Sequence, residues 1–202
     1  MNKPFLGVQL GSHSVYDEGA DHCLDTLQKT AGVNAVFVYA QMYHAGFARN
    51  RKLAALAQDH GVKAKDPSNR EMTRLWFTPH DEYYASTPVR YDAMGQHGEF
   101  AGRDIFADLE EPCRKRGIGL YARILEGFGK DLATLVPNWA RMLTVDVYGR
   151  ITQLPCFNNP GYRAWWLSTV EDLFKSYPLD GYKWGSERSG PLSNALFGAY
   201  HG

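Results

Sequence analysis

The chain has 202 residues, of which 44% are hydrophobic and 22% charged, a composition typical of one globular domain and not of a disordered protein. Its 22 basic and 22 acidic residues cancel, which argues against the basic surface of a general nucleic-acid binder. No window is apolar enough to span a membrane, so we expect neither a nucleic-acid nor a membrane partner.

Aromatic residues make up 13% of the chain, so some rings are expected at the surface or in a cleft. The cysteines Cys23, Cys113 and Cys156 lie far apart, which argues against a disulfide framework and for a reducing compartment or buried thiols. The first residues lack the apolar stretch of a signal peptide. We therefore expect a cytoplasmic protein, unless a leader has been removed.

Short apolar runs predict four strands, at 5–11, 35–40, 118–125 and 179–184. Helical spacing predicts helices over 17–30, 51–60 and 102–117, and a fourth that begins at Pro160 and stops at Tyr177. Asn159 has the residue type of its N-cap, and Pro160 suits the first helical position.

Some details of these helices and connections are also predicted. Pro112 is expected to kink or restart the third helix. The inner face of the fourth helix is expected to hold Trp165 or Trp166, Leu167, Val170, Leu173 and Phe174. Residues 62–101 lack a clean period but are rich in rings, so we interpret them as an ordered excursion, whereas residues 126–158 are expected to be mostly loop.

Strands that alternate with helices predict an α/β fold with a parallel sheet. Long segments follow the strands and short turns precede them, which places the functional face at the carboxyl ends of the strands. The Gly117–Ala122 segment matches a dinucleotide-binding pattern, but it follows a helix and opens a strand, so we reject it. The histidines lack metal-ligand spacing, and we expect neither a metal nor a cofactor.

Polar residues follow three of the predicted strands: His44 the second, Glu126 the third, and Glu187 with Arg188 the fourth. Two carboxyl groups at one edge suit glycoside hydrolysis, in which one protonates the glycosidic oxygen and the other acts as nucleophile or base. Rings such as those of Trp76, Trp139 and Trp184 would stack on a pyranose.

Structural interpretations stay open for the same residues. Glu126 and Glu187 pair equally well with Arg123 and Arg188 as ordinary rim carboxylates. His44 suits a loop cap, and His80 a surface position. Lys183 alternates with its neighbours, so it points either towards a site or against a helix layer. Asp180 is expected to bond to backbone.

Several segments resemble the α-L-fucosidases and related glycoside-hydrolase-like barrels. The matching segments, in chain order, are 31–40 with 43–47, 104–121, 156–160 and 162–184. In the fucosidases a strand like 35–40 ends in a His-His-Asp-Gly-Phe signature, so the resemblance implies that His44 contacts sugar. This chain departs from the family pattern at Tyr43, at Ala45 and at Gly185, which stands at the position of the fucosidase nucleophile.

The resemblance implies a (β/α)8 TIM-barrel-like fold, of which residues 1–202 form a single domain with about four β/α units. A complete barrel takes roughly 250 residues. Either the chain is the amino-terminal half of a larger catalytic domain, or two copies form a homodimer that completes the barrel, or the strand count is too low.

We therefore expect a glycoside hydrolase acting on a neutral sugar, with Glu187 as the principal catalytic carboxylate and Glu126 as the second. The expected substrate contacts are His44, Trp76, His80, Lys183, Trp184 and Arg188. The alternative is a degenerate barrel that binds carbohydrate without catalysis. A sugar isomerase or epimerase is a third hypothesis, which the histidine spacing supports little.

Overall fold

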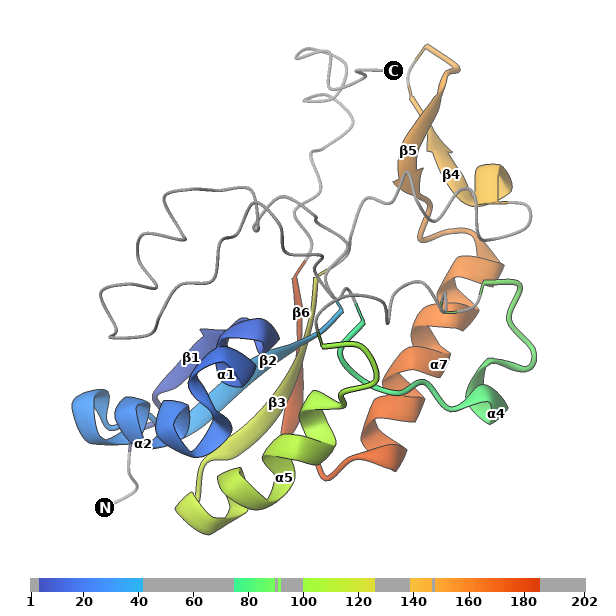
Figure 1. The fold of residues 1–202 in the computed structure, drawn as a ribbon. Coiled ribbons are helices and arrows are strands. Elements are labelled where there is room, and N and C mark those ends of the chain that lie inside the picture. The colour runs from blue at the N-terminus through green and yellow to red at the C-terminus, as the bar shows by residue number, and fades with distance from the viewer. Residues whose placement is uncertain are drawn as a thin grey trace.

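The structure is a computed structural model that describes residues 4–41, 75–89, 91, 100–125, 139–146 and 148–185. Its centre is a four-stranded parallel sheet in the order β1-β2-β3-β6, shown in Figure 1. The strands are β1 (Gly7–Leu10), β2 (Ala35–Gln41), β3 (Gly119–Leu125) and β6 (Gly181–Gly185). Among the described residues this sheet is open, with β1 and β6 at its edges, and the α/β class predicted from the sequence is confirmed.

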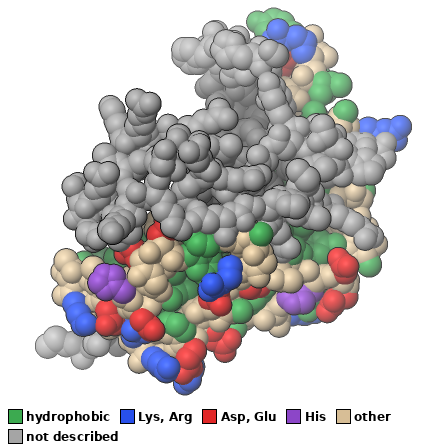
Figure 2. All heavy atoms as spheres, viewed as in Figure 1, with side chains coloured by type: hydrophobic (Ala, Val, Ile, Leu, Met, Phe, Trp, Pro, Cys, Tyr) green, Lys and Arg blue, Asp and Glu red, His purple; other side chains and the backbone are tan. Residues whose placement is uncertain are grey.

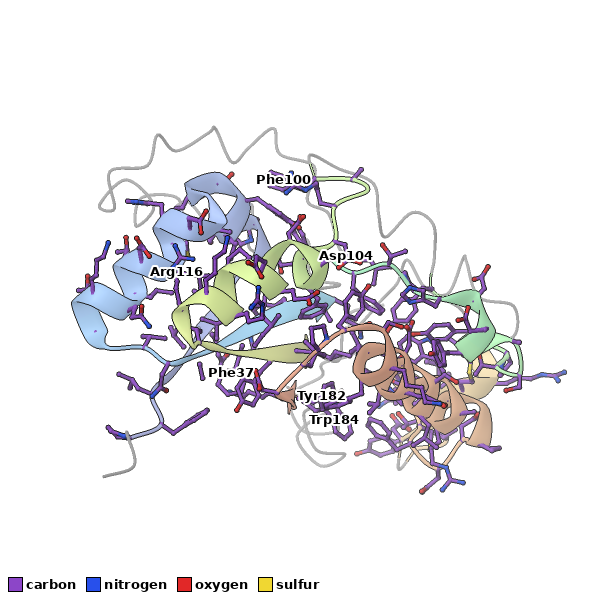
Figure 3. All side chains as sticks on the ribbon, turned by 90° about the horizontal axis from the view of Figure 1, so that it is seen from below. Phe37, Phe100, Asp104, Arg116, Tyr182 and Trp184 are labelled. Carbon is purple, nitrogen blue, oxygen red and sulfur yellow. The ribbon has the colours of Figure 1, made fainter. Side chains whose placement is uncertain are left out.

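Every connection between these strands steps to the next strand in the same direction. The helices are α1 (Ser12–Glu18), α2 (Ala20–Ala31), the short α4 (Asp81–Tyr84), α5 (Ile105–Arg116) and α7 (Pro160–Ser176). Because parallel crossovers are right-handed, steps in one direction place the crossover helices on one face of a sheet. Figures 1 and 3 show α1, α2 and α5 together on one side of the sheet.

The two faces of the sheet differ in their side chains, because successive strand residues point to opposite sides. The face towards the helices is aliphatic, and its central members are buried: Val36, Val38, Ala40, Leu120, Ala122 and Ile124. The opposite face, here called the helix-free face, carries aromatic and basic side chains: Phe37, Tyr39, Tyr121, Arg123 and Lys183. Figure 3 shows Phe37 on the side of the sheet away from α5.

Helix α5 runs without interruption from Ile105 to Arg116 through Pro112, so the predicted restart is wrong. Proline removes only one backbone hydrogen bond, and the buried stripe of Ile105, Phe106, Leu109 and Cys113 holds the helix on both sides of it. The Asp104 side chain caps the helix by accepting from the backbone N–H groups of Phe106 and Ala107. The helix ends at Gly117, whose φ of 62° suits glycine.

Helix α7 begins as predicted, with the Asn159 side chain accepting from two backbone N–H groups and Pro160 in the first turn. Our prediction of which residues form its buried face is partly wrong. Leu167 and Phe174 are 71% and 45% exposed, while Thr169 and Asp172 are fully buried. These two polar side chains are satisfied by partners from the segment before α5, Tyr91 and His80 respectively.

A two-stranded antiparallel hairpin stands within the connection that was expected to be mostly loop. A 3-10 turn, η3 (Trp139–Met142), leads into β4 (Leu143–Val145), which pairs with β5 (Ile151–Pro155). The Asp146 carboxylate accepts from the backbone N–H groups of Tyr148 and Arg150, which stabilises the turn. Because the hairpin joins β3 to α7, it belongs to the carboxyl side of the sheet, as Figure 1 shows.

Charges of both signs are interspersed over the described part of the surface in Figure 2. Among the helices described, none is long and apolar enough to cross a membrane.

The three cysteines are free, and two of them lie in the core. Burial raises the pKa of the Cys23 thiol to about 11. Burial also raises the pKa of the Cys113 thiol, to about 12, although the charge of Arg116 acts in the opposite direction. Because the thiolate is the reactive form, we expect a thiol reagent at pH 8 to label only the partly exposed Cys156 in the native protein and all three after denaturation. Rapid labelling of Cys23 or Cys113 in the native protein would contradict this packing.

Candidate functional site

The carboxyl ends of three strands meet at one edge of the sheet. Strands β2, β3 and β6 are parallel and end at Gln41, Leu125 and Gly185. In α/β folds this edge holds the functional site. The sequence-predicted residues His44, Glu126, Glu187 and Arg188 follow these ends within three positions along the chain, and they lie outside the described residues.

Lys183 and Trp184 are neighbours on β6, so they point to opposite faces of the sheet. Lys183 pairs in register with Arg123 on the helix-free face, and its ammonium lies 5.7 Å from the centroid of the Phe37 ring. Of the two orientations that the sequence left open for Lys183, the structure has the one that points away from the helix layer.

Trp184 lies on the helix side of the sheet. Its ring is 5.0 Å from that of Phe157, just before α7, and 5.9 Å from that of Trp166 on α7. The side chain is nevertheless 47% exposed, because β6 is an edge strand of the described sheet. Trp184 and Lys183 therefore do not line the same surface.

The helix-free face carries a layer of rings with two basic groups. The Arg123 guanidinium carbon lies 4.1 Å above the centroid of the Tyr39 ring. The Phe37 and Tyr121 rings are tilted against each other at 4.8 Å. Tyr121 also lies so close to Gly181 that a Cβ at this glycine would come within 2.5 Å of the ring, so the position requires glycine.

Sequence reasoning missed most of this face. Phe37, Tyr39 and Tyr121 were not proposed as site residues, and Arg123 only as a partner for a rim carboxylate. The signal was present, since larger or more polar residues at 37, 39, 121 and 123 alternate with small aliphatic ones.

Trp76 is fully buried, and its ring stacks on Tyr16 at 5.9 Å, with Phe100 at the same distance. The backbone N–H of Trp76 donates to the carbonyl of Ala40 in β2, and its carbonyl accepts from the backbone N–H of Ile105 in α5. This environment favours a packing role for Trp76 and leaves no exposed ring face for a sugar.

His80 lies at the start of α4 and contacts α7. Its Nδ1 is 2.8 Å from Oδ1 of the buried Asp172, and its backbone N–H donates to Oδ2 of the same carboxylate at 3.0 Å. The His80 side chain is 38% exposed. The structure thus ties His80 to a helix, whereas Lys183 lies on the sheet.

The carboxylate of Asp104 helps, through Tyr177, to hold the segment that contains Thr78 and His80. The Tyr177 hydroxyl donates to Asp104 and accepts from the backbone N–H of Thr78. Burial, together with this bond to Asp104, raises the pKa of Tyr177, so its hydroxyl stays a donor. Asp180, by contrast, accepts from the backbone N–H of Leu120, the structural role predicted for it.

Within the described ranges, no three His, Cys, Asp or Glu side chains are grouped so that they could hold a metal ion. No protein-family model, curated protein or solved structure matches the chain. The geometry of the sheet and the residues that follow its strands are therefore the features from which a function can be inferred.

Proposed function

We propose that the chain is a glycoside hydrolase built on a (β/α)8-type barrel, whole or partial, with its site at the carboxyl edge of the sheet. The observation that carries the proposal is the one-directional parallel sheet β1-β2-β3-β6, with its crossover helices on one face and rings and basic groups on the other. In a (β/α)8 barrel the helices surround the sheet and the opposite face lines the interior.

The proposed chemistry uses two carboxyl groups. Glu126 directly follows β3, and Glu187 follows its neighbour β6 by two residues. Glu187 is the principal catalytic carboxylate and Glu126 the second, one protonating the leaving oxygen and the other acting as nucleophile or base. His44, Lys183 and Arg188 are the substrate contacts that this edge supports best. An α-L-fucosidase-like specificity is the finer form of the proposal.

The second candidate is a barrel that binds carbohydrate without cleaving it. Trp184 favours it, because its ring is partly exposed on the helix side of the sheet and contacts the rings of Phe157 and Trp166, and an exposed ring held by its neighbours suits stacking on a sugar.

A panel of nitrophenyl glycosides, incubated with the intact chain, tests the two candidates. The hydrolase predicts release of nitrophenol from at least one glycoside, with a bell-shaped pH profile from its acid and base. Saturation-transfer NMR on the same panel detects binding. Binding without release from any glycoside would identify the non-catalytic candidate, and neither binding nor release would contradict both.

A further inference from the structure

A buried carboxylate and a partly exposed imidazole form a pair where α4 packs against α7, two helices that lie side by side in Figure 1. Asp172 on α7 has no exposed side-chain surface, whereas the side chain of His80, just before α4, is 38% exposed. The contacts proposed for the glycoside site include neither residue. A histidine held by a buried carboxylate is an arrangement that enzymes use for acid–base and nucleophilic catalysis.

The orientation of the His80 ring is fixed by several contacts. Oδ1 of Asp172 lies 2.8 Å from Nδ1 of His80, and Oδ2 accepts from the backbone N–H of His80 at 3.0 Å. The hydroxyl of Ser176 donates to Oδ1 at 2.8 Å and holds the carboxylate in turn. The rings of Tyr83 and Tyr177 pack against the imidazole, with centroid distances of 6.5 and 6.2 Å. These contacts leave the imidazole little freedom to turn.

The same contacts determine which ring nitrogen carries the hydrogen. A carboxylate oxygen only accepts, so Nδ1 is the donor, and Nε2 of the neutral ring keeps its lone pair. The two nitrogens of an imidazole point in nearly opposite directions, so this lone pair points away from Asp172. The exposed part of the ring lies on that side as well, because the Asp172 side chain has no exposed surface. Nε2 is therefore placed to act as a nucleophile.

The surroundings of His80 favour a neutral substrate over an anionic one. Asp81 and Glu82, the next two residues along the chain, are both exposed. Their negative charges repel a phosphate, whereas an uncharged ester feels no such repulsion. The half-buried ring of Tyr83, beside the imidazole, supplies apolar surface for the organic part of an ester.

We propose that His80 is the nucleophile of a second catalytic centre, which hydrolyses activated esters of carboxylic acids. Nε2 attacks the carbonyl carbon and forms an N–C bond, and the bond from this carbon to the leaving oxygen breaks with its electron pair. Asp172 keeps the Nδ1–H hydrogen bond and stabilises the positive charge of the acyl-imidazolium. Water then attacks the acyl carbon, the N–C bond breaks, and the proton that is set free balances the one taken up by the leaving oxygen. His80 is the catalytic residue and Asp172 a positioning residue.

Hydrolysis of para-nitrophenyl acetate by the intact chain, followed as release of nitrophenolate, tests this centre. We expect His80→Gln to lower the rate by about 10²-fold, the lower end of the usual contribution of a positioned catalytic group. His22→Gln is the matched control, because His22 is an exposed histidine on α2, and it should react like the parent chain. Para-nitrophenyl phosphate should not be cleaved. Circular dichroism checks that each variant is folded.

The variant Asp172→Asn tests the positioning role. The backbone N–H of His80 still requires an acceptor, which places the amide oxygen at the position of Oδ2 and the NH2 group at that of Oδ1. The NH2 group then donates to Nδ1, so the ring hydrogen moves to Nε2 and the lone pair there is lost. We expect the rate to fall to about that of His80→Gln, and NMR of the ring nitrogens to show the change of tautomer. A merely structural role for Asp172 would not change the tautomer.

Equal rates in the parent chain and in folded His80→Gln, or an equal loss in His22→Gln, would overturn the inference, and so would cleavage of the phosphate in place of the ester. If Asp172→Asn does not fold, NMR of the parent chain decides, because a hydrogen on Nε2 there contradicts the positioning role. A chain that hydrolyses the ester through His80 and cleaves no glycoside supports this centre and contradicts the glycoside hydrolase. A chain that cleaves a glycoside, and whose ester hydrolysis does not depend on His80, does the opposite.

Discussion

Replacing Glu187 with glutamine is expected to lower hydrolysis of the best glycoside substrate by about 10²- to 10⁴-fold, the usual contribution of a general acid or base. Glutamine keeps the size of the side chain but neither donates a carboxyl proton nor carries the negative charge of a nucleophile. Binding of the same glycoside should change little, because the amide retains hydrogen-bonding capacity. Steady-state kinetics should therefore show a loss in kcat at a nearly constant KM.

Glu110→Gln is the matched control, since Glu110 is an exposed glutamate on α5, on the helix side of the sheet. It removes the same charge from the same chain and should leave kcat and KM unchanged. Undiminished turnover in Glu187→Gln would remove this residue from the mechanism. An equal loss in both variants would indicate an effect of net charge instead of catalysis.

The strands of the sheet could be predicted because buried parallel strands are continuous apolar runs. The segment 35–40 has this property, 118–125 has it apart from Arg123, and 179–184 is interrupted by Asp180 and Lys183. The three segments form β2, β3 and β6 within two residues of the expected bounds. The start of α7 and the end of α5 were predictable for a different reason. Asn159 caps α7 with its side chain, and Gly117 ends α5 with a left-handed φ. Both signals are local in the sequence and do not depend on tertiary contacts.

The hairpin and the buried face of α7 could not be predicted in this way. Strand β4 has three residues, too few for an alternating pattern to be visible. In α7, periodicity favours Leu167 and Phe174 over Thr169 and Asp172, because it assumes that polar side chains face water. The structure buries Thr169 and Asp172 because Tyr91 and His80 supply hydrogen bonds from a distant segment.

For the candidate site, the sequence showed that Lys183 and Trp184 alternate but not which of them faces the helices. That choice depends on the direction of every crossover, which is a property of the whole sheet. The composition of the helix-free face follows from it, because β2 and β3 contribute Tyr39 and Arg123 only once their register with β6 is known. This is why the sequence predicted the edge of the sheet as the site and missed the face.

The carboxylate of Asp172 on α7 forms hydrogen bonds that hold the segment before α5 against this helix. It is fully buried, and it accepts from Nδ1 and the backbone N–H of His80 and from the hydroxyl of Ser176. Removing it leaves these donors without their acceptor, and buried donors without partners are costly. Because His80 is partly exposed, water can solvate part of what is lost.

We expect Asp172→Ala to lower the free energy of unfolding by about 3 kcal/mol, measured by urea denaturation, since it removes a buried carboxylate and the hydrogen bonds that the carboxylate accepts. Asp172→Asn should lose less stability, because its amide oxygen still accepts a hydrogen bond. Some loss remains, because its NH2 group then faces a donor. The neighbouring Glu171→Ala is the control: Glu171 is exposed and forms an ion pair with Lys175 one turn away, so its loss should stay below about 0.5 kcal/mol. If Asp172→Ala costs no more than Glu171→Ala, the carboxylate does not hold the segment, and the burial of α7 must come from its rings alone.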